Sequence, residues 1–141
     1  MRQKVIESLA SSWDFWSVKD VVDTLAQRHT ECFFLTDEQF NDVENVKGFV
    51  LYSCDYENAD LLYVYTPHRV RREGYASQLI EQSLQRLRYK QVTRVTLEVR
   101  KSNVAAQSFY KRHNFEEIDR RIQYYKDGED AIVMTKEILT P

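Results

Sequence analysis

A carboxylate and a phenol lie close together in the segment "LEVRKSNVAAQSFYKRHNF", residues 97–115. Glu98 stands among apolar residues near the end of an expected strand, and Tyr110 lies within the helix expected to follow it. A positioned carboxylate can accept a proton from an attacking group, and a phenol can donate one to a leaving group. The spacing alone leaves open whether they are solvated surface groups or parts of one reaction centre.

A basic loop, "RVRREGYAS" at residues 69–77, is the second segment that suggests chemistry. Arg71, Gly74 and Ala76 have the spacing R-x-x-G-x-A immediately before an expected helix. Glycine allows a tight turn, and the first N–H groups of a helix have no intrahelical acceptor, so a pyrophosphate would fit there. A basic surface turn whose glycine merely begins a helix is the alternative. The glycines of a dinucleotide-binding fingerprint and the lysine-hydroxyl pair of a P-loop are both absent from the sequence.

Hydrophobic periodicity and turn residues indicate which elements position these groups. They predict helices at 17–28, at 75–90 and from about Asn103 to His113, the last with Ser102 as its cap. They predict strands at 31–36, 47–56, 59–66 and 92–100. A hairpin is expected over 120–138, with its turn at Asp127-Gly128. In the 92–100 strand, Val95, Leu97 and Val99 face one side, and Thr96, Glu98 and Arg100 face the other. The strands flanking the 75–90 helix can be parallel neighbours, whereas the others are antiparallel. The order predicts a mixed α/β (α+β) fold with helices packed on one sheet.

Bulk composition limits the class of protein. The chain has 141 residues, of which 43% are hydrophobic and 30% charged, so we expect one domain over residues 1–141 with a packed core. The formal net charge of -2 argues against nucleic acid as the main partner. The N-terminal sequence has no apolar signal region and no run approaches a membrane span, so we expect no membrane partner and a cytoplasmic location.

The cysteines and histidines predict no metal site and no disulfide framework. Cys32 and Cys54 are the only cysteines, and His29, His68 and His113 have no metal-ligand spacing. The sequence also has no G-x-S-x-G elbow and no Cys-His motif. These two absences fit a group transfer by direct attack of the acceptor.

Three motifs together resemble a known family: "LEVRKSNVAAQSFYKRHNF", "RRIQYYKDGEDAIVM" and "RREGYA". They resemble L-E-V-R-x-S-N-x-A-A-x-x-L-Y-x-x-x-G-F, R-x-x-Y-Y-x(n)-E-D-A-x-x-M and the R/Q-x-x-G-x-G/A loop of the GCN5-related N-acetyltransferase (GNAT) superfamily. The first two are similar to its ribosomal-protein-alanine N-acetyltransferase (RimI-type) branch. The resemblance covers about residues 60–138 and implies the GNAT fold, a mixed central β-sheet flanked by helices.

The resemblance also implies roles for individual residues. Glu98 matches the general base and Tyr110 the general acid of the family. The positions that match contacts of its cosubstrate, acetyl-coenzyme A, are Tyr63, Val64, Tyr65, Arg71, Arg72, Glu73, Gly74, Tyr75, Ala76, Ser77 and Asn103. Tyr124 and Tyr125 lie in the hairpin that borders the peptide cleft of the branch, which implies that they contact the acceptor.

The implied activity is acetyl transfer from acetyl-coenzyme A to a primary amine. The branch indicates the N-terminal α-amine of a protein, such as a ribosomal protein, as the acceptor. A small amine, a lysine side chain, and a non-catalytic coenzyme A-binding module remain as alternatives. The N-terminal region departs most from the family, because the first strand is missing or reduced to "RQKVI". Asn114 replaces the glycine after the branch's helix, a mild change because asparagine is the next-best left-handed helix cap.

Overall fold

The computed structural model describes residues 23, 27, 29–36, 46–66 and 74–138. Within them the strands are β1 Thr30–Thr36, β2 Val46–Asp55, β3 Asn58–Tyr65, β4 Arg94–Arg100, β5 Glu116–Arg121 and β6 Ala131–Glu137, and the longer helices are α3 Tyr75–Tyr89 and α4 Val104–Arg112. The expected helix at 17–28 and the reduced strand "RQKVI" lie outside the residues whose structure can be followed. The other expected elements are present, and the mixed α/β fold is confirmed.

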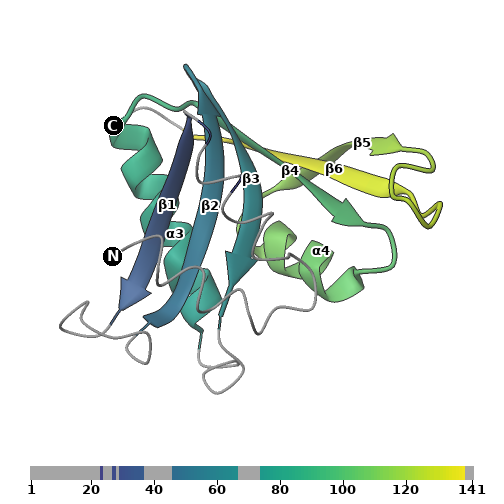
Figure 1. Cartoon of the computed structure of the whole chain (residues 1–141), viewed down its shortest axis with the longest axis horizontal. Coiled ribbons are helices and arrows are strands. Elements are labelled where there is room, and N and C mark those ends of the chain that lie inside the picture. The colour runs from purple at the N-terminus through teal and green to yellow at the C-terminus, as the bar shows by residue number, and fades with distance from the viewer. Residues whose placement is uncertain (1–22, 24–26, 28, 37–45, 67–73, 139–141) are drawn as a thin grey trace.

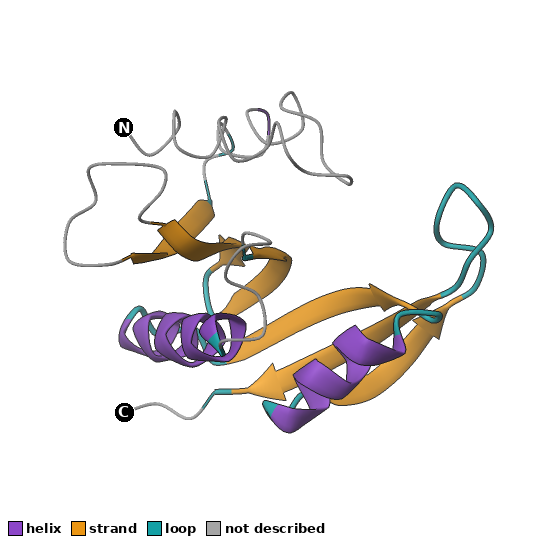
Figure 2. Cartoon of the chain, turned by 90° about the horizontal axis from the view of Figure 1, so that it is seen from below, coloured by secondary structure: helices purple, strands orange, loops and turns teal. Residues whose placement is uncertain are grey.

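The sheet has the order β1-β2-β3-β4-β6-β5, and it opens between its two central strands. β3 and β4 are parallel neighbours, as predicted, but they pair only from Asn58↔Arg94 to Asp60↔Thr96. Beyond these pairs the strands diverge, so that β1–β3 and β4–β6–β5 form the two arms of a V (Figure 1). Figure 2 shows α3 beside the first arm and α4 beside the second.

The core of the first arm lies between β2 and α3. In β2, Val50 and Tyr52 are fully buried in the same cluster as Leu79, Ile80, Leu84 and Leu87 of α3. The buried hydroxyl of Tyr52 hydrogen-bonds Ser83 Oγ at 2.7 Å, and Ser83 Oγ donates to the Ile80 carbonyl at 3.0 Å. Gly48 allows this close packing, because a Cβ there would lie 2.8 Å from the carbonyl oxygen of Tyr65.

The hairpin differs from its prediction in where its strands end. β5 is Glu116–Arg121, so residues 122–130 form a loop, which we call the hairpin loop, and Tyr124 and Tyr125 lie in it rather than in a strand. The turn signal is confirmed, since Gly128 has φ 87° and its N–H donates to the Tyr125 carbonyl at 2.9 Å. The strand ends early because the N–H groups of Tyr124 and Tyr125 both donate to the Glu129 carbonyl, at 3.1 Å each, instead of extending the ladder.

The two ends of α4 explain how Tyr110 is held. The cap is Asn103 rather than the predicted Ser102: the Asn103 Oδ1 accepts from the Ala106 N–H at 3.1 Å. At the other end Asn114 has φ 67°, which confirms the predicted left-handed cap. The N–H of Phe115 donates to the Tyr110 carbonyl, and that of Asn114 to the Lys111 carbonyl, both at 3.0 Å, the pattern of a Schellman motif. This motif brings the Phe115 ring 5.7 Å from the Tyr110 ring.

Candidate active site

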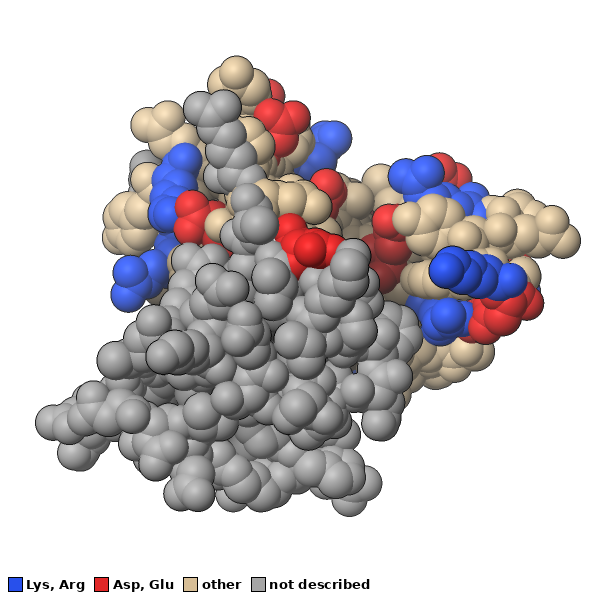
Figure 3. Space-filling view, viewed as in Figure 1, with Lys and Arg blue, Asp and Glu red and all other residues tan. Residues whose placement is uncertain are grey.

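The opening between β3 and β4 forms a cavity of about 700 Å³. Its walls are β3, β4, α4 and the hairpin loop, and the lining includes Asp60, Tyr63, Val64, Glu98, Asn103, Tyr110, Arg121, Tyr124 and Tyr125. The cavity exists because the β3–β4 ladder stops after Asp60, which leaves the facing edges of the two strands apart. A hollow with acidic side chains on its walls separates the two arms in the space-filling view (Figure 3).

Glu98 is fixed in the cavity by contacts at both carboxylate oxygens. Its Oε1 accepts a hydrogen bond from the Tyr124 hydroxyl at 3.1 Å, and its Oε2 lies 2.9 Å from Arg121 Nε. The predicted alternation of β4 is confirmed, because Val95, Leu97 and Val99 are buried while Glu98 is exposed. A carboxylate has about four lone-pair sites, so Glu98 can still accept a proton or a hydrogen bond from a ligand.

Tyr110, on α4, lines the same cavity as Glu98. It packs against the core beside Phe109 and Phe115, with ring centroids at 5.3 and 5.7 Å. Burial raises the pKa of Tyr110 to about 12, so its hydroxyl remains protonated at neutral pH. A half-buried, protonated phenol of this kind can donate a hydrogen bond toward an anion that forms in the cavity.

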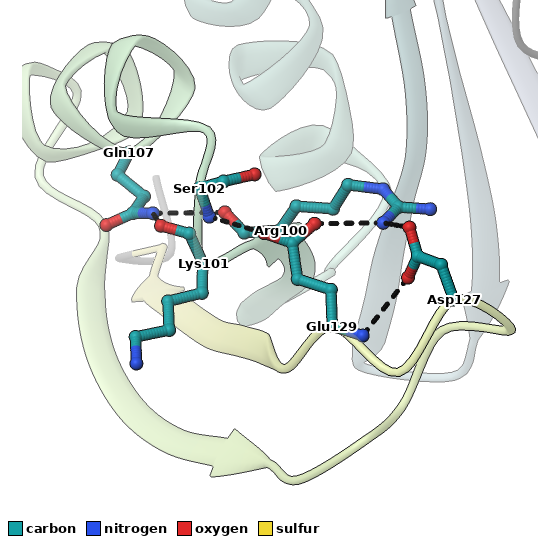
Figure 4. Close-up of polar contacts among 6 residues, drawn as sticks. All are labelled: Arg100, Lys101, Ser102, Gln107, Asp127 and Glu129. Atoms are coloured by element: carbon teal, nitrogen blue, oxygen red, sulfur yellow. Dashed lines mark hydrogen bonds and ion pairs between the residues drawn. The ribbon is translucent and has the colours of Figure 1, made fainter.

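A cluster of charged groups holds the hairpin loop against β4 and the turn before α4 (Figure 4). The Arg100 guanidinium contacts Asp127 at 2.8 Å and Glu129 at 2.9 Å, and the second Glu129 oxygen accepts from the Ser102 N–H at 2.8 Å. These hydrogen bonds hold the pKa of Glu129 below its usual value. The same guanidinium lies 4.0 Å from the centre of the Tyr125 ring, so the cluster sets the position of both tyrosines over the cavity.

The charge of Glu98 also affects the two tyrosines. It raises the pKa of Tyr124 and, after burial, that of Tyr125. Both hydroxyls therefore stay protonated near neutral pH and can donate hydrogen bonds. On the opposite wall, burial and the nearby Asp55 raise the pKa of Asp60, a second carboxylate that lines the cavity.

The β3 wall contains a bulge next to the predicted cosubstrate positions. Leu61 pairs with Tyr52 and Tyr63 with Leu51, so Leu62 is an extra residue in β3. Tyr63 and Val64 line the cavity, whereas the Tyr65 side chain is buried against Phe49, with ring centroids at 5.6 Å. Tyr65, unlike Tyr63 and Val64, is therefore not one of the residues that line the cavity.

The predicted anion loop ends at the first turn of α3. Gly74 has φ 81°, and no heavy atom of the described residues lies within 4 Å of the place where its Cβ would be. Arg71, Arg72 and Glu73 lie outside the part of the chain that the structure describes. Ser77, in the same turn, hydrogen-bonds His113 Nε2 at 3.0 Å, and His113 Nδ1 lies 2.6 Å from Glu81. Since His113 caps the C-terminus of α4, this bridge ties the start of α3 to the helix that bears Tyr110.

The structure thus brings together Glu98, Tyr110, Asn103, Tyr63, Val64, Tyr124 and Tyr125 around one cavity. Gly74, Tyr75, Ala76 and Ser77 lie apart from it, at the α3 N-terminus. Sequence reasoning missed Arg121 and Asp60. Arg121 begins the R-x-x-Y-Y motif, so its position beside the tyrosines was the available signal.

Other kinds of site find no support in the described residues. They contain no cluster of three or more His, Cys, Asp or Glu side chains placed to hold a metal ion. Among them, too, no helix combines the length and hydrophobicity needed to cross a membrane. Cys32 and Cys54 form no disulfide bond with one another in the described part of the chain.

Comparison with known proteins gives a consistent result. The model of the acetyltransferase (GNAT) family matches residues 2–115. The sequence is 29% identical over 125 residues to MJ1530 of Methanocaldococcus jannaschii, described as an uncharacterized N-acetyltransferase, covering 87% of this chain and 70% of that protein. It is 28% identical over 100 residues to the ribosomal protein bS18-alanine N-acetyltransferase of Haemophilus ducreyi, covering 68% and 69%.

A solved structure resembles nearly the whole chain. The ribosomal-protein-S18-alanine N-acetyltransferase of Escherichia coli superposes with a TM-score of 0.82 and 26% sequence identity, covering 99% of this chain and 89% of that one. The fold expected from the three motifs is therefore shared with a protein of the branch that they resemble.

Proposed function

The chain belongs to the acetyltransferase (GNAT) family and is an acetyl-coenzyme A-dependent N-acetyltransferase, and we propose that its acceptor is the N-terminal α-amine of a protein. The observation that carries the proposal is the placement of Glu98 and Tyr110 in one cavity, beneath the tyrosines of the hairpin loop. Family membership favours an enzyme over the non-catalytic coenzyme A-binding module.

The residues present fit acetyl-coenzyme A at two places. At the start of α3, the left-handed Gly74 and the open space beside it leave room for a pyrophosphate near the first-turn N–H groups of residues 75–77. Arg71, Arg72 and Glu73 would complete that loop. Along β3, the backbone of Tyr63–Tyr65 would lie beside the pantetheine and acetyl groups. Asn103 would border the same groups, while its side-chain oxygen Oδ1 caps α4.

The cosubstrate supplies an activated acetyl group as a thioester and a thiolate leaving group. The protein must then deprotonate the acceptor, because an α-amine with a pKa of about 7.7–8.0 is mostly protonated at neutral pH. Glu98 is placed to accept that proton at a carboxylate oxygen, directly or through a water. N–H groups on the edge of β3 that faces the cavity can stabilise negative charge that develops on the acetyl oxygen.

Tyr110 is proposed to act at the leaving sulfur. Its pKa of about 12 keeps the proton on the phenol, so it can donate a hydrogen bond as the thiolate forms. The cysteine thiol has a pKa of about 8.5, well below that of Tyr110, so complete transfer of the phenol proton to a thiolate of that basicity would be uphill. Tyr110 therefore stabilises the thiolate chiefly by hydrogen bonding, and its own proton is replaced from water if it is transferred at all.

The choice of a protein N-terminus rests on the cavity opening and on the relatives. Tyr124 and Tyr125 line the cavity with protonated hydroxyls, which suit the carbonyl groups of an extended peptide. Two of the similar proteins are named as N-acetyltransferases that act on an alanine of ribosomal protein S18. An α-amine is also easier to deprotonate at neutral pH than a lysine side chain, with a pKa of about 10.4.

A small cationic amine is the second candidate, because Asp60 places another carboxylate in the cavity with Glu98. Two carboxylates would suit two ammonium groups of a polyamine. The test is a panel of acceptors with saturating acetyl-coenzyme A: an alanine-starting peptide, the same peptide with a blocked N-terminus and an internal lysine, and spermidine.

We expect turnover of the free-N-terminus peptide to exceed that of the other two acceptors. The peptide activity should fall by about 10²–10⁴-fold in Glu98→Gln. Glu116→Gln, an exposed carboxylate of β5 outside the cavity, is the matched control and should keep wild-type activity. Turnover of spermidine with none of the free peptide would reverse the order of the two candidates.

A further inference from the structure

An arginine opposite the proposed base has no role in the function described so far. Arg121 Nε lies 2.9 Å from Glu98 Oε2, and the Arg121 guanidinium lies 5.7 Å from the centre of the Tyr124 ring. The Arg121 side chain is 55% exposed and that of Glu98 is 32% exposed. A pair this open to solvent contributes little to stability, so stability alone gives a weak reason for it.

The strand register explains how the two residues meet across an intervening strand. Glu98 pairs with Val133 of β6, and Arg121 pairs with Ala131 of the same strand. Alternate residues of a strand share a face, so Glu98 and Arg121 both project toward the cavity. Arg120, the neighbour on β5, pairs with Ile132 and therefore projects from the opposite face.

The charges in the cavity matter because the acceptor arrives as a cation. The ionisable groups that line the cavity together with the Glu98–Arg121 pair are Asp60 and Tyr63 on β3, Arg100 on β4, Tyr110 on α4, and Tyr124 and Tyr125 on the hairpin loop. On β5, Asp119 pairs with Val133 as Glu98 does, so it projects from the same face as Arg121, and its Oδ1 accepts from the Arg120 N–H at 2.8 Å. The tyrosines are neutral at pH 7, and Arg100 is engaged by Asp127 and Glu129. The guanidinium of Arg121 therefore balances the charge of Glu98 at the place where the amine must lose its proton.

We propose that Arg121 is a charge-balancing and positioning residue of the acceptor site, which holds Glu98 and weakens binding of the acceptor in its ammonium form. The inference rests on the proposed role of Glu98. A positive charge near an amine disfavours the protonated form, so the bound amine loses its proton more readily. The same charge selects against acceptors that bring a second cation into the cavity, which would place polyamines behind peptides.

The first test compares pH profiles of kcat for the alanine-starting peptide in wild type, Arg121→Gln, Arg121→Lys and Arg120→Gln. In Arg121→Gln the acidic limb should move to higher pH by about half to one unit, since the pair is partly exposed and screened. Arg121→Lys should restore the limb because it restores the charge. Arg120→Gln removes the same charge from the opposite face and should leave the limb in place.

The second test does not depend on turnover. Calorimetry should show spermidine binding to the coenzyme A-saturated Arg121→Gln protein about three- to tenfold more tightly than to wild type or Arg120→Gln, as expected from the same electrostatic shift. Unchanged spermidine affinity, or an equal change in Arg120→Gln, would overturn the proposal. A loss of kcat in Arg121→Gln that is equal at every pH, with the acidic limb unmoved, would also overturn the proposal. If wild type acetylates no peptide, the result counts against the proposed function instead.

Discussion

The left-handed residue after α4 offers a test that connects stability to the position of Tyr110. Asn114 has φ 67°, and its N–H and that of Phe115 close the helix with two hydrogen bonds at 3.0 Å. An alanine in this conformation has no side-chain oxygen to relieve the strain of its Cβ, whereas glycine has no Cβ at all. The prediction is therefore a large difference between two small substitutions at one position.

The magnitude follows from the backbone conformation. A left-handed conformation costs an ordinary L-residue about 1–2 kcal/mol, and asparagine already carries part of that cost, so Asn114→Ala should lose about 1 kcal/mol of unfolding free energy. For a chain of this length that corresponds to a Tm lower by about 3 °C. Asn114→Gly should remain within about 0.5 kcal/mol of wild type.

The assay is urea and thermal unfolding of both variants, with Lys111→Ala, in the last turn of the same helix, as the control. Lys111→Ala should change the unfolding free energy by no more than about 0.5 kcal/mol. Equal stabilities of the alanine and glycine variants at position 114 would refute the reasoning. Because the same motif sets the Phe115–Tyr110 contact, kcat should fall in Asn114→Ala and not in Asn114→Gly.

The remaining predictions concern the buried Tyr52 and the half-buried Tyr110. Ser83→Ala should lower the unfolding free energy by about 1–3 kcal/mol, because it leaves the buried Tyr52 hydroxyl without its partner. Tyr52→Phe should lower it by only about 0.5–1.5 kcal/mol, because Ser83 keeps its hydrogen bond to the Ile80 carbonyl. In urea unfolding, the double variant should lose less than the sum of the two single changes; strict additivity would contradict a direct hydrogen bond. Tyr110, with a pKa raised by burial to about 12 from 10.0, keeps its proton in the folded state at a pH where the unfolded chain loses it. Stability should therefore fall as pH rises from about 10 to 12, by up to roughly 2–3 kcal/mol from this group, and Tyr110→Phe should show a shallower decline in the same titration. Equal slopes for wild type and Tyr110→Phe would argue against a buried phenol.

Strong hydrophobic periodicity made several helices and strands predictable from the sequence. β4 alternates cleanly between buried Val95, Leu97 and Val99 and the polar residues between them, so the face that carries Glu98 could be assigned before the fold was known. α3 buries a regular apolar stripe, which fixed its helical assignment. These elements follow from local sequence because each has one face in the core.

The hairpin could not be placed in the same way. Every residue of β5 is exposed, so the sequence "EEIDRR" offers no alternation that would mark a strand. Its aromatic neighbours Tyr124 and Tyr125 have high β-propensity, yet they lie in the hairpin loop because Arg100, Asp127 and Glu129 hold that loop by charge contacts. Tertiary contacts between segments distant in sequence outweighed local propensity.

The cavity itself also lay beyond sequence reasoning. It depends on β3 and β4 parting after Asp60, and no residue type signals where a parallel ladder stops. The family motifs indicated that Glu98 and Tyr110 act together, but the link from Glu98 to Arg121 crosses an intervening strand and required the register of β6.

The central claim is that Glu98 and Tyr110 serve one acetyl transfer in different ways. The most direct measurement is the pH dependence of kcat for an alanine-starting peptide at saturating acetyl-coenzyme A, in wild type, Glu98→Gln and Tyr110→Phe. The Glu98→Gln defect should shrink above about pH 8, where the α-amine loses its proton without help, whereas the Tyr110→Phe defect should persist at every pH. Wild-type kcat in both variants at pH 7, or a Glu98→Gln defect equally large at pH 7 and pH 9, would contradict the account.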